Sequence, residues 1–422
     1  MTHSIPQPNC VDSPAAGALT VEAAGQRILE ATTAIAGEAC IPLHHGLHRI
    51  LATAVTAPLD VPAHTNAAVD GFALRGADLP DEENSRLPIV GTALAGHPWP
   101  HPLAPGQAVR IMTGAPLPAG ADTVLMQEQV TEMAGYLVIP PGHKPGENVR
   151  LAGEDLRRGE TVLEAGRYLL PPDLGLIASL GRLEVTVKRR LRVALVSTGD
   201  EILPQGAPHA PGKLYDSNRF SLRGALQARL GVELLDGGIV PDEEARLERR
   251  FRTLADKCDV IIASGGVSVG SADYTKSVLA RLGGIEFWKV AIKPGRPLAF
   301  GHIGDCLFFG LPGNPVAVLV TFYRFVLPAL FKRAGAREIP MIPTFPARVR
   351  ERLHKKPGRT EFQRGILERD SQGRWQVRTT GRQGSGILSS MSCADCFIVL
   401  EHDRGPVRPG EWVEVLPFAA LM

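Results

Sequence analysis

The sequence has few aromatic residues, few cysteines and almost no net charge. Phe, Trp and Tyr make up 5% of its 422 residues, and the formal net charge is +2. A charge this small argues against bulk nucleic-acid binding, which requires a strongly basic face. Six cysteines are too sparse for a disulfide scaffold in a chain of this length. These absences predict a globular protein that has no nucleic-acid partner and no disulfide framework.

Long uninterrupted hydrophobic runs are also missing. The longest apolar stretch, residues 316–331, is interrupted by Arg324 and Pro328. It is too short for a bilayer and predicts a buried helix instead. The first ten residues, MTHSIPQPNC, contain no basic segment followed by an apolar one, so no signal peptide is expected. We therefore expect a soluble, cytoplasmic protein with no membrane partner.

The chain is rich in glycine and proline, with 45 and 35 residues, and their distribution suggests several domains. Residues 1–18 lack apolar periodicity and are expected to be disordered. Residues 19–190 form an N-terminal region, a helical and linker part with a β-rich lobe inserted at about 58–150. A helix is predicted to begin after Thr20, and a second, short one to run from Leu47 to Ala54.

The remainder of the chain divides into two further domains. Residues 191–335 alternate strands and helices, which is typical of a doubly wound α/β domain. Residues 341–422 return to short β segments separated by Gly and Pro, and they favour a small β-barrel or sandwich. The predicted fold class is therefore multidomain α/β, with a central doubly wound domain, a β-rich N-terminal lobe and a C-terminal β-barrel domain.

Three glycine-rich loops, at residues 264–276, 289–301 and 309–316, follow predicted strands of the central domain. Loops at the carboxyl ends of such strands converge in one crevice, where glycine lets backbone amides approach an oxyanion. The spacing in the first loop matches neither a Walker A motif nor a dinucleotide fingerprint. A tight strand–helix turn with Ser271 as N-cap is the alternative interpretation. The predicted phosphate-binding residues are Gly265, Gly266, Ser268, Gly270, Ser271, Pro312, Gly313, Asn314 and Pro315.

Charged residues accompany these loops. Lys289, Lys293 and Arg296 lie within eight residues and would suit phosphate or a tetrahedral metal oxide. Acidic residues follow other predicted strand ends, namely Glu201, Asp242 and Asp273. Two or three such carboxylates beside a bound phosphate would form a Mg²⁺ site. For Asp242 and Asp273, a helix-opening role is the alternative.

Two other patterns are interpreted without a functional role. Cys393 and Cys396 form a C-x-x-C pair, but the sequence supplies neither the two further ligands of a zinc site nor a thioredoxin-like βαβ context. Arg249, Arg250 and Arg252 lie among acidic residues on one predicted helix and are interpreted as a solvated face.

From about residue 20 to its end, the chain resembles the molybdopterin molybdenumtransferases of the MoeA type, which are similar to the gephyrin E domain. The resemblance rests on several motifs in the same order, namely AAVDGFAL (67–74), IMTGAPLPAGADTVLMQE (111–128), GENVRLAGEDL (146–156), VSTGDEI (196–202), the three glycine loops, GRTEFQRG (358–365) and GSGILSSM (384–391). It implies insertion of molybdate into adenylylated molybdopterin with Mg²⁺-dependent release of AMP. It also implies an elongated homodimer in which the α/β domain of one subunit faces the β-rich lobe of the other. A molybdopterin adenylyltransferase and molybdoenzyme apoproteins are the implied protein partners.

The resemblance also implies roles for single residues. Asp70, Thr113, Arg150 and Asp155 match polar residues that the lobe offers to the facing site. Lys289 and Lys293 match site lysines, and Glu201, Asp242 and Asp273 match acidic positions tied to the metal and to hydrolysis. The implied molybdate pocket consists of Lys293, Arg296, Arg364 and Ser385.

The motifs also depart from the family pattern. The family's usual S-A-M-D-G-Y-A reads A-A-V-D-G-F-A at 67–73, and Ser271 stands where Glu often follows the first glycine loop. The Cys393–Cys396 segment replaces a common Asn-Gly-type turn. Two other functions therefore stay open: a non-catalytic molybdopterin-binding scaffold of the gephyrin kind, and a molybdopterin adenylyltransferase. The adenylyltransferase resembles residues 190–335 alone, and it would consume ATP.

Overall fold

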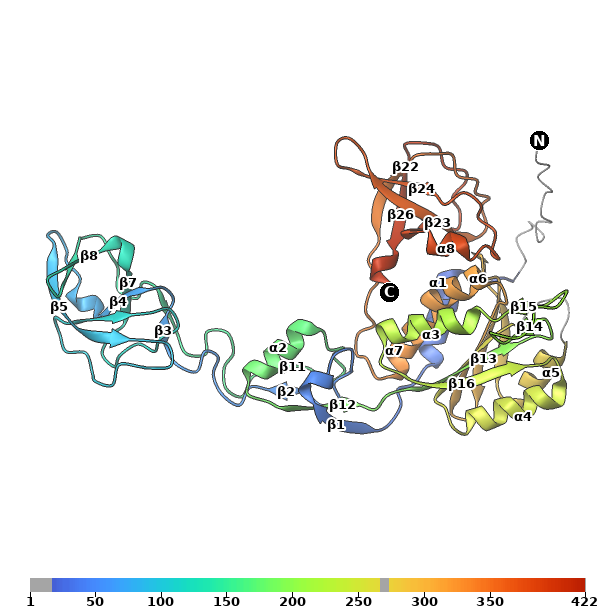
Figure 1. Ribbon diagram of the computed structural model, residues 1–422, viewed down its shortest axis with the longest axis horizontal. Helices are drawn as coiled ribbons and strands as arrows, with labels where there is room; N and C mark the ends of the chain where they lie inside the picture. The colour runs from blue at the N-terminus through green and yellow to red at the C-terminus, as the bar shows by residue number, and fades with distance from the viewer. Residues whose placement is uncertain (1–16, 266–272, 422) are drawn as a thin grey trace.

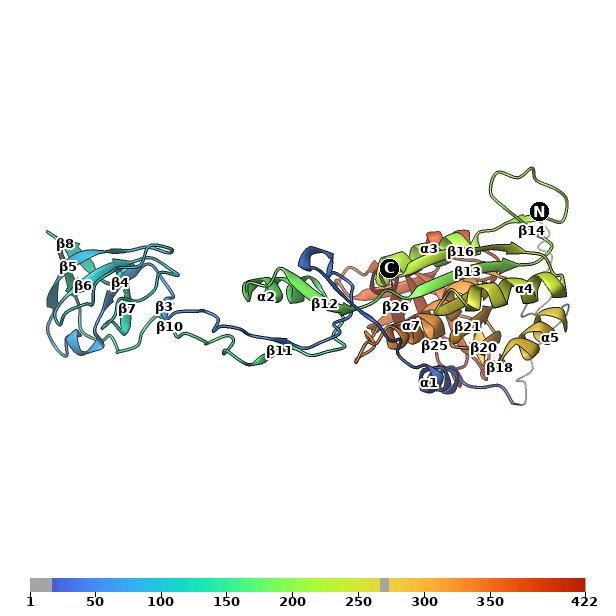
Figure 2. The ribbon, with the colours of Figure 1, turned by 90° about the horizontal axis from the view of Figure 1, so that it is seen from below.

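The computed structural model describes residues 17–265 and 273–421, with residues 273–276 and 287 described by their backbone alone. The molecule is elongated (Figures 1 and 2). A strand-rich lobe occupies one end, a thin arm follows it, and the α/β domain and the barrel form the other end. The predicted fold class, with its central α/β domain, N-terminal lobe and C-terminal barrel, is confirmed.

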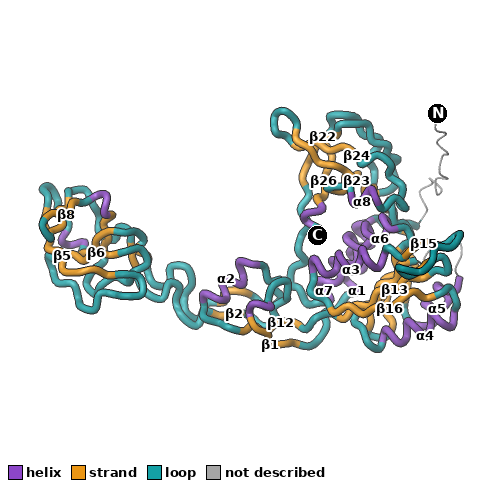
Figure 3. The backbone as a smooth tube through the Cα atoms, viewed as in Figure 1, coloured by secondary structure: helices purple, strands orange, loops and turns teal. Residues whose placement is uncertain are grey.

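The lobe consists almost entirely of strands and loops (Figure 3). Its six-stranded sheet has the order β7-β4-β6-β5-β9-β8. Gly71 begins β4 where the backbone of β7 is very close, because a Cβ there would lie 1.8 Å from the carbonyl oxygen of Leu125. The strands of the lobe are β3 (Asn66–Ala67), β4 (Gly71–Leu74), β5 (Ser85–Ala93), β6 (Ala108–Ile111), β7 (Thr123–Met126), β8 (Thr131–Met133), β9 (Tyr136–Ile139) and β10 (Val149–Arg150).

The arm is built from two short antiparallel pairs and one helix. Strand β1 (Glu38–Pro42) pairs with β12 (Glu184–Lys188), β2 (Val55–Thr56) pairs with β11 (Thr161–Leu163), and α2 spans Pro171–Ser179. The helix predicted from Leu47 to Ala54 is wrong. Ile50 bridges to Tyr168 and Leu51 to Val187, and both side chains are buried. Cross-strand pairing therefore satisfies backbone groups that a helix would have satisfied internally.

The α/β domain is organised around a six-stranded sheet in the order β16-β13-β17-β21-β20-β18. All strands run in one direction except β20, which is antiparallel to both neighbours. Helix α1 (Val21–Ala31) begins as predicted, because Thr20 Oγ1 accepts from the backbone N–H of Ala23 at 3.1 Å. The other elements are β13 (Arg192–Thr198), β14 (Ile202–Leu203), β15 (Leu214–Tyr215), α3 (Asn218–Arg229), β16 (Glu233–Val240), α4 (Glu244–Ala255), β17 (Val260–Ser264), α5 (Asp273–Leu282), β18 (Ile285–Lys289), β20 (Pro297–Ile303) and β21 (Cys306–Leu311).

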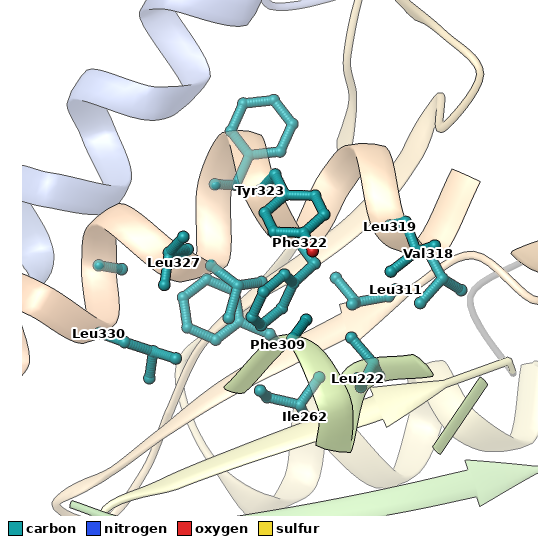
Figure 4. Packing of buried hydrophobic residues seen from close by; sticks show 14 of the residues in the cluster. Leu222, Ile262, Phe309, Leu311, Val318, Leu319, Phe322, Tyr323, Leu327 and Leu330 are labelled. Carbon is teal, nitrogen blue, oxygen red and sulfur yellow. The ribbon is translucent and has the colours of Figure 1, made fainter. Parts of the chain in front are cut away.

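A single helical stretch fills the core of this domain. Helices α6 (Pro315–Thr321) and α7 (Leu327–Arg333) are joined by a π-helical turn, Phe322–Val326. Figure 4 shows the side chains of this stretch packed on Phe309 and Ile262 of the sheet. By length and composition, Pro315–Arg333 would suffice to cross a membrane, but 78% of its apolar window is buried inside the protein. Burial rather than length therefore identifies it as the predicted core helix.

The C-terminal domain is a closed barrel. Strands β23, β24, β22, β26 and β25 follow one another, and pairing of β25 with β23 closes the ring. Cys396 of the C-x-x-C pair is buried in the barrel core, whereas Cys393 is exposed. The elements are β19 (Ile292–Lys293), which joins β23 from the central domain, then β22 (Phe345–Val349), β23 (Thr360–Arg369), β24 (Trp375–Thr379), α8 (Ser389–Ser392), β25 (Cys396–Leu400) and β26 (Trp412–Pro417).

A buried ion pair fixes the start of the central sheet to the arm. Asp259, 5% exposed, accepts two hydrogen bonds from Arg189 at 2.7 and 2.8 Å, and one from the backbone N–H of Arg192 at 2.7 Å. Although burial opposes ionisation, these donors prevail and lower the pKa of Asp259 to about 2. The ionised carboxylate therefore stabilises the fold above the ordinary pKa of 3.8, and the stabilisation is lost as pH falls through about 2.

We expect Asp259 to contribute about 2 kcal/mol to the free energy of unfolding at neutral pH. The Asp259→Asn variant should be destabilised at pH 7, and its difference from the wild type should shrink between pH 4 and pH 2. Urea denaturation at a series of pH values measures this. A difference that does not change over that range would show that the pKa of Asp259 is not lowered.

Candidate functional site

The glycine loops begin at the carboxyl edge of the central sheet. Asn218, the first residue of α3, donates from Nδ2 to Ser264 Oγ at 3.0 Å and to the carbonyl oxygen of Gly313 at 2.8 Å. Gly265 has φ +94°, and a Cβ there would lie 2.4 Å from the carbonyl oxygen of Thr198. Asn218 thus holds the first and third loops together, and glycine is required where the first loop leaves its strand.

Polar atoms at this edge lack partners within the described protein. Thr198 Oγ1 and Asn218 Oδ1 are both buried without a hydrogen bond. Buried groups of this kind are normally satisfied, so an unpartnered pair beside two glycine loops indicates a place for a ligand. Of the predicted phosphate-binding residues, Gly265 and Pro312–Pro315 lie at this edge. The predictions for Gly266, Ser268, Gly270 and Ser271 lie outside the described residues.

The acidic residues at the ends of β13 and β16 lie side by side. Asp200 Oδ1 accepts from the backbone N–H of Asp242 at 3.2 Å, while Asp242 Oδ1 is buried without a partner. Burial, followed by the negative charges of Asp200 and Glu201, raises the pKa of Asp242. Helix α4 begins two residues later, at Glu244, so Asp242 does not start the helix.

This acidic cluster fits a divalent cation only in part. An orphaned carboxylate oxygen next to two further acids is the environment that a hard cation relieves. Within residues 17–265 and 273–421, however, no group of three or more His, Cys, Asp and Glu side chains is placed to hold a metal ion. Mg²⁺ commonly takes one or two carboxylates and completes its shell with phosphate and water. The residues present therefore fit Mg²⁺ together with a phosphate ligand. The backbone of Asp273 lies at the start of α5, and its side chain is outside the description.

The cations of the second loop lie between the sheet and the barrel. Lys289 ends β18 at the same edge as the ends of β13 and β17, and it is exposed. The carbonyl oxygen of Arg296 accepts from the backbone N–H of Val290 at 2.8 Å, which closes the loop on itself. Lys293 Nζ lies 3.3 Å from Glu361 Oε1 of the barrel. The second loop therefore directs its charges toward both the sheet edge and the barrel.

The barrel contributes a buried guanidinium. Arg364 is 1% exposed, and its nitrogens donate to three neutral oxygens, those of Ser390 Oγ, Arg382 O and Gly384 O. Burial lowers its pKa to about 10, so it stays cationic at neutral pH. It lines a cavity of about 280 Å³ together with Lys293 and Glu361. A buried cation with no carboxylate partner in the described chain is a natural site for an anion.

A direct contact joins the third loop to the barrel. Asn314 Nδ2 donates to Ser385 Oγ at 2.9 Å, and the backbone N–H of Val316 donates to the carbonyl oxygen of Ser385 at 3.1 Å. Ser385 therefore lies beside the third glycine loop. Two of the barrel residues singled out in the sequence, Arg364 and Ser385, thus lie where the central domain meets the barrel.

The lobe presents its own polar cluster. Asp70 accepts from both the backbone N–H and the Oγ1 of Thr113, each at 2.7 Å. These two bonds lower the pKa of Asp70, which is fully exposed. Arg150 and Asp155 are also exposed and lie near the point where the lobe joins the arm. Within one chain, this cluster is at the opposite end of the molecule from the glycine loops (Figure 1). One subunit alone does not bring the predicted residues together.

Sequence reasoning missed several residues at the site. Asn218 and Thr198 can be recognised as site residues only in the folded sheet, where three strand ends lie close together. Glu361 and Gln363 lie within the GRTEFQRG motif, yet their buried contact, 3.2 Å from Gln363 Nε2 to Glu361 Oε2, depends on the closed barrel. Lys355, 3% exposed, donates to the carbonyl oxygen of Lys356 at 2.7 Å. Lys355 lies between His354 and Lys356, so no local pattern marked it as a buried residue.

Comparisons with known proteins cover nearly the whole chain. Residues 19–181 match the family model described as the MoeA N-terminal region (domain I and II). Residues 194–332 match the probable molybdopterin binding domain, and residues 346–418 match the MoeA C-terminal region (domain IV).

Individual relatives agree with these matches. The molybdopterin molybdenumtransferase of Haemophilus influenzae is 42% identical over 405 residues, covering 96% of this chain and all of that protein. The protein of the same name from Bacillus subtilis is 33% identical and covers 89% of each chain. A crystal structure of the molybdopterin biosynthesis MoeA protein of Pyrococcus horikoshii superposes with a TM-score of 0.80 at 28% identity, over 94% of this chain and all of that one.

Proposed function

The chain belongs to the MoeA family of molybdopterin molybdenumtransferases, and on that premise we propose that it inserts molybdate into adenylylated molybdopterin with release of AMP. The observation that carries this proposal is the buried Arg364 guanidinium, which shares a cavity with Lys293 and has only neutral oxygens as hydrogen-bond partners. A small tetrahedral dianion fits such a cavity. Lys293 belongs to the second glycine loop, and the glycine loops supply amides for the phosphates of the pterin substrate.

The residues divide the work by charge. Lys293, Arg296, Arg364 and Ser385 bind and orient molybdate beside the pterin. Asn218 and Asn314 hold the loops that receive the phosphates, with Lys289 at the same edge. A molybdate oxygen or a water oxygen attacks phosphorus and forms a new P–O bond as the phosphoanhydride bond to the leaving AMP breaks. Negative charge develops on the phosphoryl oxygens in this step, so fixed cations that face these oxygens lower the barrier.

Glu201 and Asp242 would hold Mg²⁺ together with substrate phosphate oxygens, and Asp273 is the third acidic position. When bound, the ion neutralises phosphate charge and favours departure of AMP. The supporting observation is the orphaned Asp242 Oδ1 within an acidic cluster. The metal also explains why like charges are gathered where they would otherwise repel one another.

The lobe residues complete the site from a second copy of the chain. Asp70 is held in place by Thr113, and both are exposed on the lobe, whereas Arg150 and Asp155 are exposed near the point where the lobe joins the arm. In a homodimer of two such elongated subunits, the lobe of each can face the α/β domain of the other. A molybdopterin adenylyltransferase would supply the substrate, and molybdoenzyme apoproteins would take up the product.

The direct test incubates the purified protein with adenylylated molybdopterin, molybdate and Mg²⁺ and follows AMP. We expect AMP release that depends on molybdate and needs no ATP. Pterin binding without AMP release would instead identify a scaffold protein, and a requirement for ATP would identify an adenylyltransferase.

The Arg364→Lys variant tests the molybdate pocket. Lysine keeps the charge but cannot donate to Ser390, Arg382 and Gly384 together, so the cation loses its fixed position. We expect the KM for molybdate to rise about tenfold or more, while the affinity for the pterin substrate changes little. Steady-state AMP release at varied molybdate measures the first quantity, and pterin fluorescence measures the second. An unchanged KM for molybdate would remove Arg364 from the pocket.

A further inference from the structure

A second cavity, of about 820 Å³, lies at the opposite edge of the central sheet. Its walls lie where three strands of the sheet begin. These are β13, which begins at Arg192, β17, which begins at Val260, and β21, which begins at Cys306. The segment between α1 and β1, residues 33–36, forms another wall. None of the predicted site residues that the structure describes lines it. It is therefore separate from the site at the carboxyl edge.

The lining of this cavity is rich in arginine, and most of these charges already have partners. Arg189 and Arg192 share Asp259, Arg252 pairs with Glu248 at 2.8 Å, and Arg281 pairs with Glu244 at 2.5 Å. The helix face containing Arg252, interpreted from the sequence as merely solvated, forms part of this wall. A surplus of paired arginines does not by itself make a binding site.

Arg333 is the exception among these cations. It is 8% exposed, and its guanidinium donates to Thr33 O at 3.0 Å, to Thr33 Oγ1 at 3.1 Å and to Asp305 O at 2.5 Å. All three acceptors are neutral. In the part of the chain that the structure describes, no carboxylate forms an ion pair with Arg333, and its Nε has no hydrogen-bond partner. Burying a cation in this way is costly unless an anion accompanies it.

A second unpartnered donor lies in the same wall. Arg192 Nε is also buried without a hydrogen bond, although the end of that side chain reaches Asp259. Burial, followed by the positive charge of Arg333, lowers the pKa of His302, and the carboxylate of Asp305 acts in the opposite direction. Ile35, Ala255, Leu282 and Ile303 give the cavity an apolar portion.

We propose that this cavity is a binding site for a small organic oxyanion, a phosphate or a carboxylate, whose charged end is bound by Arg333 and Arg192. The volume is in the range of small-molecule pockets, which ordinarily combine apolar walls with a few fixed polar groups. Since residues 33–36 and 189–192 are where the chain passes between the central domain and the arm, a bound anion would connect both crossings to the domain.

The test titrates the full-length protein with inorganic pyrophosphate and, separately, with citrate, by isothermal titration calorimetry. Ala34, exposed at the wall next to Thr33, allows a matched pair of variants. Ala34→Glu adds a carboxylate and should weaken binding about tenfold, whereas Ala34→Gln adds similar bulk without charge and should leave the affinity unchanged. Preferential binding of pyrophosphate or of citrate distinguishes the phosphate from the carboxylate source.

A Lys293→Ala variant separates the two sites. If the anion binds where we propose, Lys293→Ala retains the affinity that Ala34→Glu loses. Binding that is lost in Lys293→Ala and kept in Ala34→Glu would place the probe at the carboxyl edge and overturn the proposal. Absence of binding by both probes at 10 mM, about the weak limit for a built anion site, would overturn it as well.

Discussion

Two inactive variants, Asp70→Asn in the lobe and Lys289→Ala in the α/β domain, should regain activity when they are co-expressed. Each variant alone is expected to lose at least about 100-fold in AMP release, because each removes a charged group from the site. Random pairing makes about half of the dimers mixed. In a mixed dimer, one of the two sites combines an intact lobe with an intact α/β domain. The mixture should therefore recover about a quarter of the wild-type rate.

The reason lies in the shape of the chain. Asp70 precedes β4 and Thr113 follows β6, and both strands belong to the lobe at one end of the elongated molecule. Lys289 ends β18, which lies at the other end (Figure 2). The arm between them contains β1, β2, β11, β12 and α2, whose pairings leave lobe and α/β domain apart. In the homodimer that we propose, a second copy brings the exposed lobe residues to the glycine loops.

A matched mixture controls for other causes of recovery. When Asp70→Asn is co-expressed with Thr113→Ala, both substitutions are in the lobe. Every lobe in a mixed dimer is then altered, so no mixed dimer contains an intact site. That mixture should remain as inactive as its parents. Recovery there, or failure of the first mixture in a sample with confirmed mixed dimers, would contradict a site shared between subunits.

The secondary structure of the central domain was predictable because its signals are local. Apolar runs such as residues 193–196 and 260–263 are followed within three residues by glycine, and the Thr20 cap precedes an apolar stripe. The Leu47–Ala54 segment failed for the opposite reason. Its apolar residues are satisfied by partners more than one hundred residues away, at Tyr168 and Val187, and no local pattern carries that information.

The site was predictable where its chemistry follows strand ends and unpredictable where domains meet. Glu201 and Asp242 follow strands of the central sheet and Lys289 ends one, so topology alone brings them to one edge. Lys293 contacts Glu361, 68 residues later in the sequence, and Asn314 contacts Ser385, 71 residues later. Both contacts form only because the barrel packs against the central domain. For Arg364, the sequence offered a charge, but its burial among neutral oxygens required the structure.

Replacing Asp242 with Asn should make the metal-free protein more stable and the enzyme much slower. Burial and two neighbouring acids raise the pKa of Asp242. A carboxyl group whose pKa rises on folding destabilises the fold once it is ionised. That cost is absent below the ordinary pKa of 3.8 and reaches its full size above the raised pKa. At pH 7 the neutral amide removes it, so the Tm should rise by about 2 °C.

The same substitution should remove the benefit of magnesium. If Asp242 helps to hold Mg²⁺, then adding the ion with a phosphate ligand raises the Tm of the wild type and has less effect on Asp242→Asn. AMP release should fall about 100-fold. The change in Tm on adding Mg²⁺ measures binding of the ion without relying on enzyme activity. Asp81→Asn, an exposed acid on the lobe, is the matched control and should change neither quantity.

The prediction combines two opposite effects of Asp242→Asn: the Tm rises without Mg²⁺, and the further rise caused by Mg²⁺ is lost. A residue that only supports the fold would lose stability on substitution, and a solvent-exposed acid would change nothing. A stabilised variant with a lost magnesium response is expected only if the like charges of Asp200, Glu201 and Asp242 are held together for a cation. If Asp242→Asn proves less stable than the wild type at pH 7, with its magnesium response intact, the carboxylate serves the loop rather than the metal.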